Sequence, residues 1–579
     1  MTAVRRFSAV VCLLGATSLA AQTPTPTPKI VPVQPVPPQV TPITEPVTAQ
    51  VTADTDHDLS DPRALKLSLD DALKTAVQNN VGIQLERYTL LESGQSLRGQ
   101  YGIFDWFTSA NIERQSSESP TTSQFAPSGS RATTANFGLS QLIPTGGTYS
   151  IGFNNSRGTT TGGGTFVNPA YRSSLGLGLS HPLMRNFGVD VTRRGILIAR
   201  NTLGINRDVF RGTLMDTAVT TEQVYLDLVY ARQFVDVVKE ALFLARDQAR
   251  ITQIRIDVGA SAPLDILQPR VQIATQEENL IAAVAAVRDA EDRLRAVMHL
   301  PATDWDRPII PTSPVGYTPI TVNPEQAVTT ALQLRPELHE TQLTTATRQI
   351  QYTYARNQVL PQLDLKLNYN AAGLAGRTQE FDPVTGLPTG RFVTTGYSNA
   401  LSQVFGNDFP SWTVGVNVGL PLTNIGARAE AKRAELDVAL ARTNEEQTRQ
   451  NIAVEVRKTA RDIDTTAKEI IASRTAREAA GQNLEAERRR YENGMTTNFQ
   501  VLQIQQQLSD ARAREIQALV AYNKSVAAYH RAVGDLLDVA NIKIEEPKIE
   551  EPSTFRVFDR YNWLNYGSRI QSNTTETKQ

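Results

Sequence analysis

The chain has 579 residues, a formal net charge of −1 and 40% hydrophobic residues. A charge so close to zero gives no support for nucleic-acid binding. The only cysteine is Cys12, which excludes a disulfide framework and any cysteine-based metal site. Five scattered histidines form no catalytic or metal-binding motif, so neither an enzyme, a metal nor a cofactor is expected.

The N-terminal segment has the features of an export sequence. Residues 1–20 combine Arg5 and Arg6 with a short apolar run and a small-residue cleavage site, which predicts a signal peptide. Residues 21–60 are rich in proline and threonine and read as an extended leader. No later stretch is apolar for long enough to cross a bilayer as a helix, so any membrane insertion is expected to use β-strands.

The first structural repeat is predicted over residues 61–322. Asp61 and Pro62 are expected to cap a helix, and alternating segments then indicate strands. Without an internal proline, residues 192–257 predict a helix of roughly 100 Å that ends at a Gly259 turn. The expected elements are a helix at 63–99, strands near 102–115, 132–142, 148–156 and 173–183, the long helix, and a return helix at 263–300.

The second repeat, over residues 323–540, follows the same order. Residues 326–338 align without gaps on residues 71–83. The expected elements are an opening helix, a strand at 360–370, a long loop to Pro410, a strand at 411–422, a long helix at 424–491, a turn at Gly494 and a return helix to about 537. We therefore interpret the chain as one internally duplicated architecture.

The strands have one apolar face and one polar face. Val414, Val416 and Val418 alternate with small or polar residues, which fits an outer-membrane barrel with a wet lumen. The alternative is a set of half-buried strands in a soluble sandwich. Tyr369 and Trp412 are expected at the strand ends away from the helices, where an aromatic girdle would lie.

One chain supplies too few strands to close a barrel alone. Four or six strands fall below the usual minimum of about eight, and open edges cannot face lipid. Three chains would give about 12 or about 18 strands, of which we favour 18. The helices would continue the barrel as a tube, the alternative being a solid bundle. The predicted fold class is an α+β membrane protein, a trimeric outer-membrane β-barrel continued by a periplasmic α-helical coiled-coil barrel.

The residues from about 61 to 540 resemble the TolC-like outer-membrane efflux family. The resemblance is carried by the duplicated order of elements, the corners HPLMRNFG and LPLTNIG, and the helical tips DVGASAPLDIL and YENGMTTNFQVLQ. It implies a homotrimeric channel-tunnel that serves as the exit duct of a tripartite efflux or type I secretion system. The implied partners are a periplasmic adaptor, an inner-membrane pump of the RND or ABC type, and outer-membrane lipid.

The resemblance also implies a periplasmic entrance gate at the helical tips. By motif position, the family's gate tyrosine falls on Tyr491 and its first-repeat aspartate on Asp265. The family's arginine position holds Thr496, and its two aspartates of the second tip are replaced by Gln500 and Gln503. Fewer acids at the entrance predict weaker cation selectivity and weaker binding of divalent cations.

Two further expectations concern the hairpin tips and the location. Gly259 and Gly494 are expected to form the tight turns, with adaptor contacts on the loops that flank them. The expected location is the outer membrane, with extension into the periplasm. The alternative function is a soluble periplasmic coiled-coil scaffold or adaptor. Residues 541–579 are interpreted as a C-terminal extension whose role the sequence does not reveal.

Overall fold

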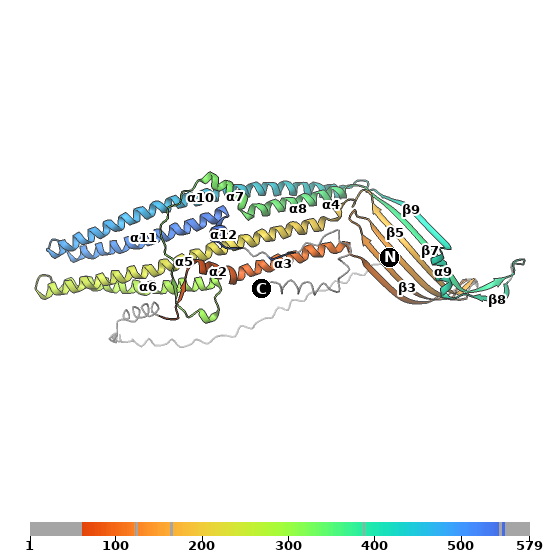
Figure 1. Cartoon of the computed structure of the whole chain (residues 1–579), viewed down its shortest axis with the longest axis horizontal. Coiled ribbons are helices and arrows are strands. Elements are labelled where there is room, and N and C mark those ends of the chain that lie inside the picture. The colour runs from red at the N-terminus through yellow and green to blue at the C-terminus, as the bar shows by residue number, and fades with distance from the viewer. Residues whose placement is uncertain are drawn as a thin grey trace, which may run out of the picture.

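The computed structural model describes residues 61–120, 122, 126–162, 166–385, 388–543 and 547–549. The expected signal peptide, leader and most of the C-terminal extension lie outside this part of the chain. Figure 1 shows an elongated molecule in which long helices lead from one sheet to two hairpin tips at the opposite end. None of the described helices is both long enough and apolar enough to cross a membrane.

Two helices of similar length set the length of the molecule. α5 (Arg194–Asp257) has 64 residues and α10 (Ile425–Glu492) has 68. α6 (Leu267–Met298) returns beside α5 and α11 (Asn498–Val533) returns beside α10, which gives the two expected hairpins. Near the sheet, α3 (Val81–Tyr101) packs on α5, and α8 (Pro336–Gln358) lies between α5 and α10. The helices therefore form one layer with α3 and α6 at one side and α10 at the other.

The opening helix of each repeat is interrupted, which the sequence did not predict. The first repeat begins with α2 (Leu69–Asn79), capped by Ser68 rather than by Asp61 and Pro62. Its break is at Asn80, whose side chain accepts from the N–H groups of Gly82 and Ile83 and donates to the Val297 carbonyl 2.9 Å away. The second repeat opens with α7 (Pro324–Leu334).

Arg335 takes the same place in the second repeat, immediately before α8. Its guanidinium donates to the carbonyl of Ala532 at the end of α11, at 3.1 Å. Residue 335 is the position that aligns with Asn80, so each repeat uses one polar side chain to join a return helix to an opening helix. These joints let two shorter helices lie end to end beside one continuous helix.

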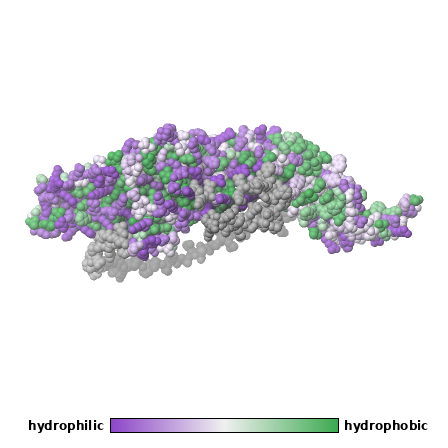
Figure 2. All heavy atoms as spheres, in the orientation of Figure 1, coloured by the Kyte–Doolittle hydropathy of each residue, from purple (hydrophilic) through white to green (hydrophobic). Residues whose placement is uncertain are grey.

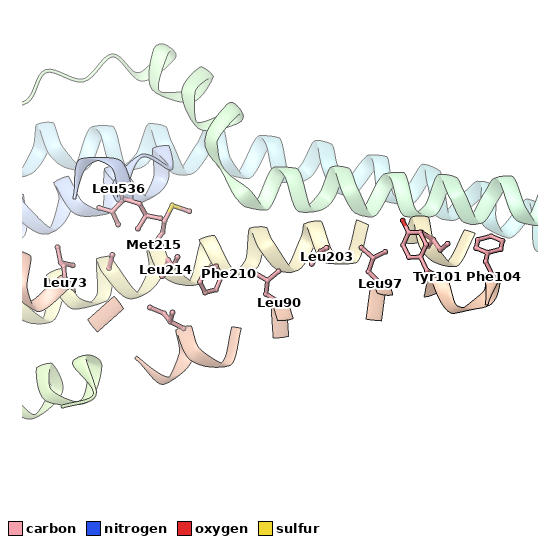
Figure 3. Packing of buried hydrophobic residues seen from close by; sticks show 14 residues of the cluster. Leu73, Leu90, Leu97, Tyr101, Phe104, Leu203, Phe210, Leu214, Met215 and Leu536 are labelled. Carbon is pink, nitrogen blue, oxygen red and sulfur yellow. The ribbon is translucent and has the colours of Figure 1, made fainter. Parts of the chain in front are cut away.

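The core follows α5 along its length. Leu90 and Leu97 of α3 pack against Leu203, Phe210 and other residues of α5, and all are buried. Leu536 of the short helix α12 (Leu536–Val539), which follows α11, belongs to the same cluster (Figure 3). The minor elements are β1 (Leu65–Leu67) paired with β6 (Ile309–Pro311), the short helix α4 (Val189–Thr192), and the 3₁₀ turns Gly102–Phe104, Pro263–Ile266 and Ala302–Asp304.

The large sheet contains seven strands within the described residues. The strands are β2 (Phe107–Glu118), β3 (Gly129–Leu142), β4 (Thr148–Thr161), β5 (Val167–Pro182), β7 (Gln362–Phe381), β8 (Pro388–Thr394) and β9 (Phe409–Gly419). They are joined antiparallel in the order β2-β3-β4-β5-β7, and β9 pairs with the half of β7 nearer the helices. β8 pairs only with the far end of β7.

The strand register gathers the apolar residues on one face. Thr108, Leu139, Ile151, Leu177, Tyr369 and Trp412 form one cross-strand row. The adjacent row on the opposite face is Ser109, Gly138, Gly152, Gly176, Asn370 and Ser411. We call the first the apolar face and the second the polar face. Hydrophobic residues gather over the part of the sheet nearest the helices (Figure 2).

The segment from 372 to 410 differs from the long loop that was predicted. β7 continues to Phe381, so Tyr369 lies in the middle of that strand rather than at its end. β8 and the helix α9 (Tyr397–Gly406) fill much of the remainder. Ala400 of α9 lies against Gly373, where an added Cβ atom would come within 2.0 Å of the Ala400 carbonyl oxygen. Small residues on β7 thus provide the seat for α9, and strand periodicity gave no indication of it.

Candidate entrance at the helical hairpin tips

The two hairpin tips are built in the same way. α5 ends at Asp257, and Gly259 has a φ of 76°, a conformation that favours glycine. Gly494, after α10, has a φ of 73°. The N–H of Ala260 donates to the Arg255 carbonyl, and the N–H of Met495 donates to the Arg490 carbonyl, so both turns have the same hydrogen-bond pattern. The two glycines therefore occupy equivalent positions in the two repeats.

A polar cluster joins the two hairpins close to these turns. Gln248 on α5 donates to the side-chain oxygen of Asn498 on α11 at 2.7 Å. The Thr252 hydroxyl lies 3.5 Å from that oxygen and 3.5 Å from the Tyr491 hydroxyl. All four side chains are buried. We call these residues, together with Arg255, the polar seam.

Arg255 is the charged member of the polar seam. Its guanidinium donates to the carbonyl of Tyr491 at 2.8 Å and to that of Glu492 at 3.2 Å. The guanidinium carbon also lies 4.4 Å from the centre of the Tyr491 ring, within the range of a cation–π interaction. One residue of α5 therefore holds the C-terminal end of α10, where a positive charge is favourable to the helix dipole.

A second polar contact joins the hairpins further from the tips. Gln276 and Gln272 of α6 donate to the side-chain oxygen of Gln506 on α11, at 2.9 and 3.2 Å. Leu484, Val501 and Ile504 are buried between α10 and α11, and Leu244 and Ile251 of α5 pack against the same cluster. The contact between the two hairpins therefore combines apolar packing with the buried hydrogen bonds of the polar seam.

The residues predicted for the gate are placed differently from one another. Tyr491 is buried in the polar seam and contacts Arg255. Asp265 is exposed at the first tip, where its carboxylate accepts from the N–H of Ala262 at 3.1 Å. Thr496 is half-buried in the second turn. Gln500 and Gln503 are exposed on the side of α11 that this chain does not cover.

Sequence reasoning missed Gln248, Thr252, Arg255 and Asn498. These residues could have been recognised from α5, where one helical stripe changes from apolar to polar residues. The buried side of α5 runs through Val235, Val238, Leu242 and Ala245, and then continues at the same spacing with Gln248, Thr252 and Arg255. A polar continuation of an apolar stripe marks the place where a helix contact changes from apolar to hydrogen-bonded packing.

No other constellation in the described residues suggests chemistry. Within that part of the chain, no three His, Cys, Asp or Glu side chains are grouped so that they could hold a metal ion. A hollow of about 880 Å³ lies between α3, α5, α8 and α10, and is lined by Arg194, which stacks at 3.6 Å over the ring of Tyr354. This hollow is open to one side of the helical layer and is part of its surface.

The comparison with known proteins agrees with this architecture. The family model described as outer membrane efflux protein matches residues 108–298 and 327–535, one segment in each repeat. The outer membrane efflux protein BepC of Brucella suis biovar 1 (strain 1330) is 23% identical over 478 residues, which cover 80% of this chain and 94% of BepC.

Solved structures show the same fold. The CmeC outer membrane channel of Campylobacter jejuni is 15% identical with a TM-score of 0.57, covering 83% of this chain and 87% of CmeC. The MtrE outer membrane channel of Neisseria gonorrhoeae, solved in an open state, is 13% identical with a TM-score of 0.55, covering 84% of this chain and 91% of MtrE. Because the family model matches more than half of the chain, this protein belongs to the TolC-like family of outer membrane efflux proteins.

Proposed function

We propose that the chain forms a homotrimeric channel-tunnel, the passive exit duct of a tripartite efflux or type I secretion system. Its sheet would cross the outer membrane, and its helices would extend through the periplasm. A periplasmic adaptor would contact the hairpin tips around Gly259 and Gly494, and an inner-membrane pump of the RND or ABC type would supply the substrate. Membership of an outer membrane efflux family supports the role of an efflux channel in the outer membrane.

The observation that carries the trimer is the pair of open sheet edges. Within the described residues, β2 pairs only with β3, and β9 pairs only with β7. The six strands β2, β3, β4, β5, β7 and β9 alternate in direction, so β9 of one copy can join β2 of the next in antiparallel pairing. Three copies would close a barrel of about 18 strands, an even number as in outer-membrane barrels of single chains.

The helical layer supports the same arrangement. Its two sides are α10 on one hand and α3 with α6 on the other. The edge strand β9 leads directly into α10, and α3 leads through a short turn into the edge strand β2. Leu436 and Leu440 of α10 are 59% and 61% exposed in one chain. A neighbouring copy placed to pair the sheets would also bring its α3 or α6 towards this side of α10. The helices would then continue the barrel as a closed tube.

The polar seam is the part of the entrance that we propose to separate during opening. Apolar surfaces that separate in water lose stabilisation in proportion to their area, whereas hydrogen-bonding groups exchange their partners for water at a smaller net cost. Gln248, Asn498 and Arg255 fit this requirement because each can be hydrated. Asp265, Thr496, Gln500 and Gln503 are proposed to line the entrance that the tips surround, and Tyr491 is proposed to separate from Arg255 as the seam opens.

The first experiment tests the duct itself. The full-length protein is expressed in a Gram-negative host, the membranes are fractionated, and the purified material is measured by light scattering in detergent and by single-channel recording in a planar bilayer. We expect outer-membrane material, the mass of a trimer and a steady ion current. A water-soluble monomer that carries no current would contradict the proposal and would favour the scaffold alternative.

A second experiment tests the polar seam. Arg255→Ala removes both hydrogen bonds to the end of α10 and is expected to raise the single-channel conductance several-fold. Arg250→Ala is the matched control, since Arg250 lies on the same helix and pairs with Asp247 of that helix at 2.8 Å. If both variants are trimeric and have equal conductance, Arg255 does not hold the entrance closed.

A further inference from the structure

Three arginines lie on the apolar face of the sheet, just beyond its apolar rows. Arg114 on β2 is the cross-strand partner of Thr133 on β3, and Thr133 is in turn the partner of Arg157 on β4. Arg131 on β3 lies one row further from the helices, between Ser116 and Thr159. At a strand spacing of about 4.8 Å, the backbones of Arg114 and Arg157 are roughly 10 Å apart, with Arg131 beside the gap.

The register establishes that these side chains share the apolar face. Thr108, Leu139 and Ile151 form a row on that face, and residues that are an even number of positions away on one strand point to the same side. Arg114 and Arg157 are each six positions from that row. By the same count Arg172 of β5 lies on the polar face, because its partners are Ser156 and Leu374.

The three arginines form an exposed positive patch. All three are exposed, and the side chain of Arg131 is 64% exposed. Glu118 is the acid on this face, with its carboxylate 3.9 Å from Arg131, a contact too long and too exposed to neutralise the patch. The Arg157 guanidinium lies 5.9 Å from the centre of the Tyr171 ring, which also packs against Tyr397 of α9.

The position of the patch matches the thickness of a membrane. Position across the membrane is counted along each arginine's own strand from its end beside the helices. Arg114 lies seven residues from Phe107, Arg157 nine from Thr148 and Arg131 eleven from Leu142. For strands tilted by about 40°, these counts correspond to roughly 18, 23 and 28 Å along the membrane normal, against an apolar band of about 25 Å in outer-membrane barrels. If the apolar face contacts lipid, Arg131 and Arg157 lie at the outer-leaflet headgroups, and the long side chain of Arg114 can extend its guanidinium group to the same level.

We propose that Arg114, Arg131 and Arg157 bind the phosphate groups of an outer-leaflet glycolipid. This inference rests on the proposed function, because it requires the sheet to lie in the outer membrane. A guanidinium group forms two parallel hydrogen bonds with phosphate oxygens, and three of them within about 10 Å can hold a doubly phosphorylated headgroup. The acyl chains would then lie along the apolar rows towards Leu177 and Ile151, and Tyr171 with α9 would border the headgroup.

The test measures lipid binding to the full-length detergent-purified protein by native mass spectrometry. The probes are bisphosphorylated lipid A, its fully dephosphorylated form, and inorganic phosphate as a competitor. The variant replaces Arg114, Arg131 and Arg157 by glutamine. The control replaces Arg172 and Lys366, two exposed cations on the polar face, by the same residue. Both variants are first checked for trimer mass and ion current.

We expect the wild-type protein and the control to bind bisphosphorylated lipid A at least about tenfold more tightly than the dephosphorylated form, and the triple variant to lose that preference. Millimolar inorganic phosphate should compete only weakly, because it lacks acyl chains. A triple variant that conducts current and keeps the preference would overturn the lipid site and leave the duct intact. Equal competition by free phosphate would show an anion site without lipid. Failure of the wild-type protein to form a conducting trimer would instead overturn the proposed function.

Discussion

The two long helices have similar lengths but different surroundings, and the difference identifies the outside of the protomer. Nineteen residues of α5 are buried, against eleven of α10. α5 contacts α2, α3, α6, α8 and α11, whereas α10 contacts α7, α8 and α11. On α5, neighbouring residues such as Leu228 and Val229 are both buried, so the helix is covered on several sides. α10 is buried along one stripe, as expected for the edge of a layer that another copy completes.

The largest effect is expected from a charge in the middle of α5. Leu228→Asp places a carboxylate at a fully buried position without a partner, and we expect a loss of more than about 4 kcal/mol of stability. The protein should fail to accumulate in the membrane fraction. The matched change is Leu440→Asp on α10, which should leave the protomer folded. Similar far-UV circular dichroism and protease resistance of both variants would mean that α5 is not the interior helix.

The complementary prediction concerns assembly. Leu436→Arg combined with Leu440→Arg should leave each protomer helical but prevent trimer formation, because two charges would be buried against the neighbouring copy. Light scattering in detergent should then give the mass of one chain. Glu446→Arg alters the charge of α10 by the same amount at an exposed position outside this apolar pair and should remain trimeric. If the double variant is also trimeric, the exposed side of α10 is not the subunit interface.

The sequence predicted the helices better than the contacts between them. The long helices, the strand alternation and the glycine turns follow from local periodicity and from the conformational freedom of glycine. The breaks at Asn80 and Arg335 were missed because each polar side chain caps a helix end that comes from a distant part of the chain. α9 was missed because it packs on small residues of β7 such as Gly373. Small residues in a strand do not by themselves predict that a helix packs on them.

The same distinction applies to the entrance. Tyr491 was identified from the second tip, but its contact with Arg255 joins residues of two different repeats. A family motif supplies positions along one chain and cannot show which hairpin supplies a partner. The arginine that contacts Tyr491 is Arg255 of α5. The position at which the family motif has an arginine is occupied by Thr496. The stripe of Gln248 and Thr252 on α5 was the only local indication of this contact.

The pH dependence of stability is expected to distinguish the two long helices as well, with a smaller effect than Leu228→Asp. Burial raises the pKa of Glu222 on α5 to about 7, and nearby His530 only partly opposes this effect. An acid whose folded-state pKa is raised contributes stability below its ordinary pKa near 4.5 and loses it as the pH rises through 7. The wild-type protein should therefore be less stable at pH 8 than at pH 5 by up to about 3 kcal/mol from this group.

Glu222→Gln should remove that dependence. The variant resembles the protonated acid, so we expect its thermal midpoint in detergent to match the wild type at pH 5 and to exceed it at pH 8. Glu446→Gln on the exposed side of α10 is the control and should change neither midpoint. An equal shift for both variants, or none for Glu222→Gln at pH 8, would show that Glu222 does not lose hydration in the assembled protein.

The smallest effect is expected at the tips, where the two hairpins differ in charge. Asp265 lies six residues after Gly259, and Gln500 lies six residues after Gly494, so only the first of these equivalent positions carries an acid. Asp265 is exposed and its charge is screened by solvent. Asp265→Asn should therefore reduce cation selectivity by less than about twofold, measured as the reversal potential in a salt gradient. Gln500→Asp adds the missing acid at the second tip and should raise both the selectivity and the block by millimolar divalent cations. Strong divalent block in the wild-type protein that Asp265→Asn leaves unchanged would mean that other acids govern the entrance, and would place the narrowest point of the duct away from these turns.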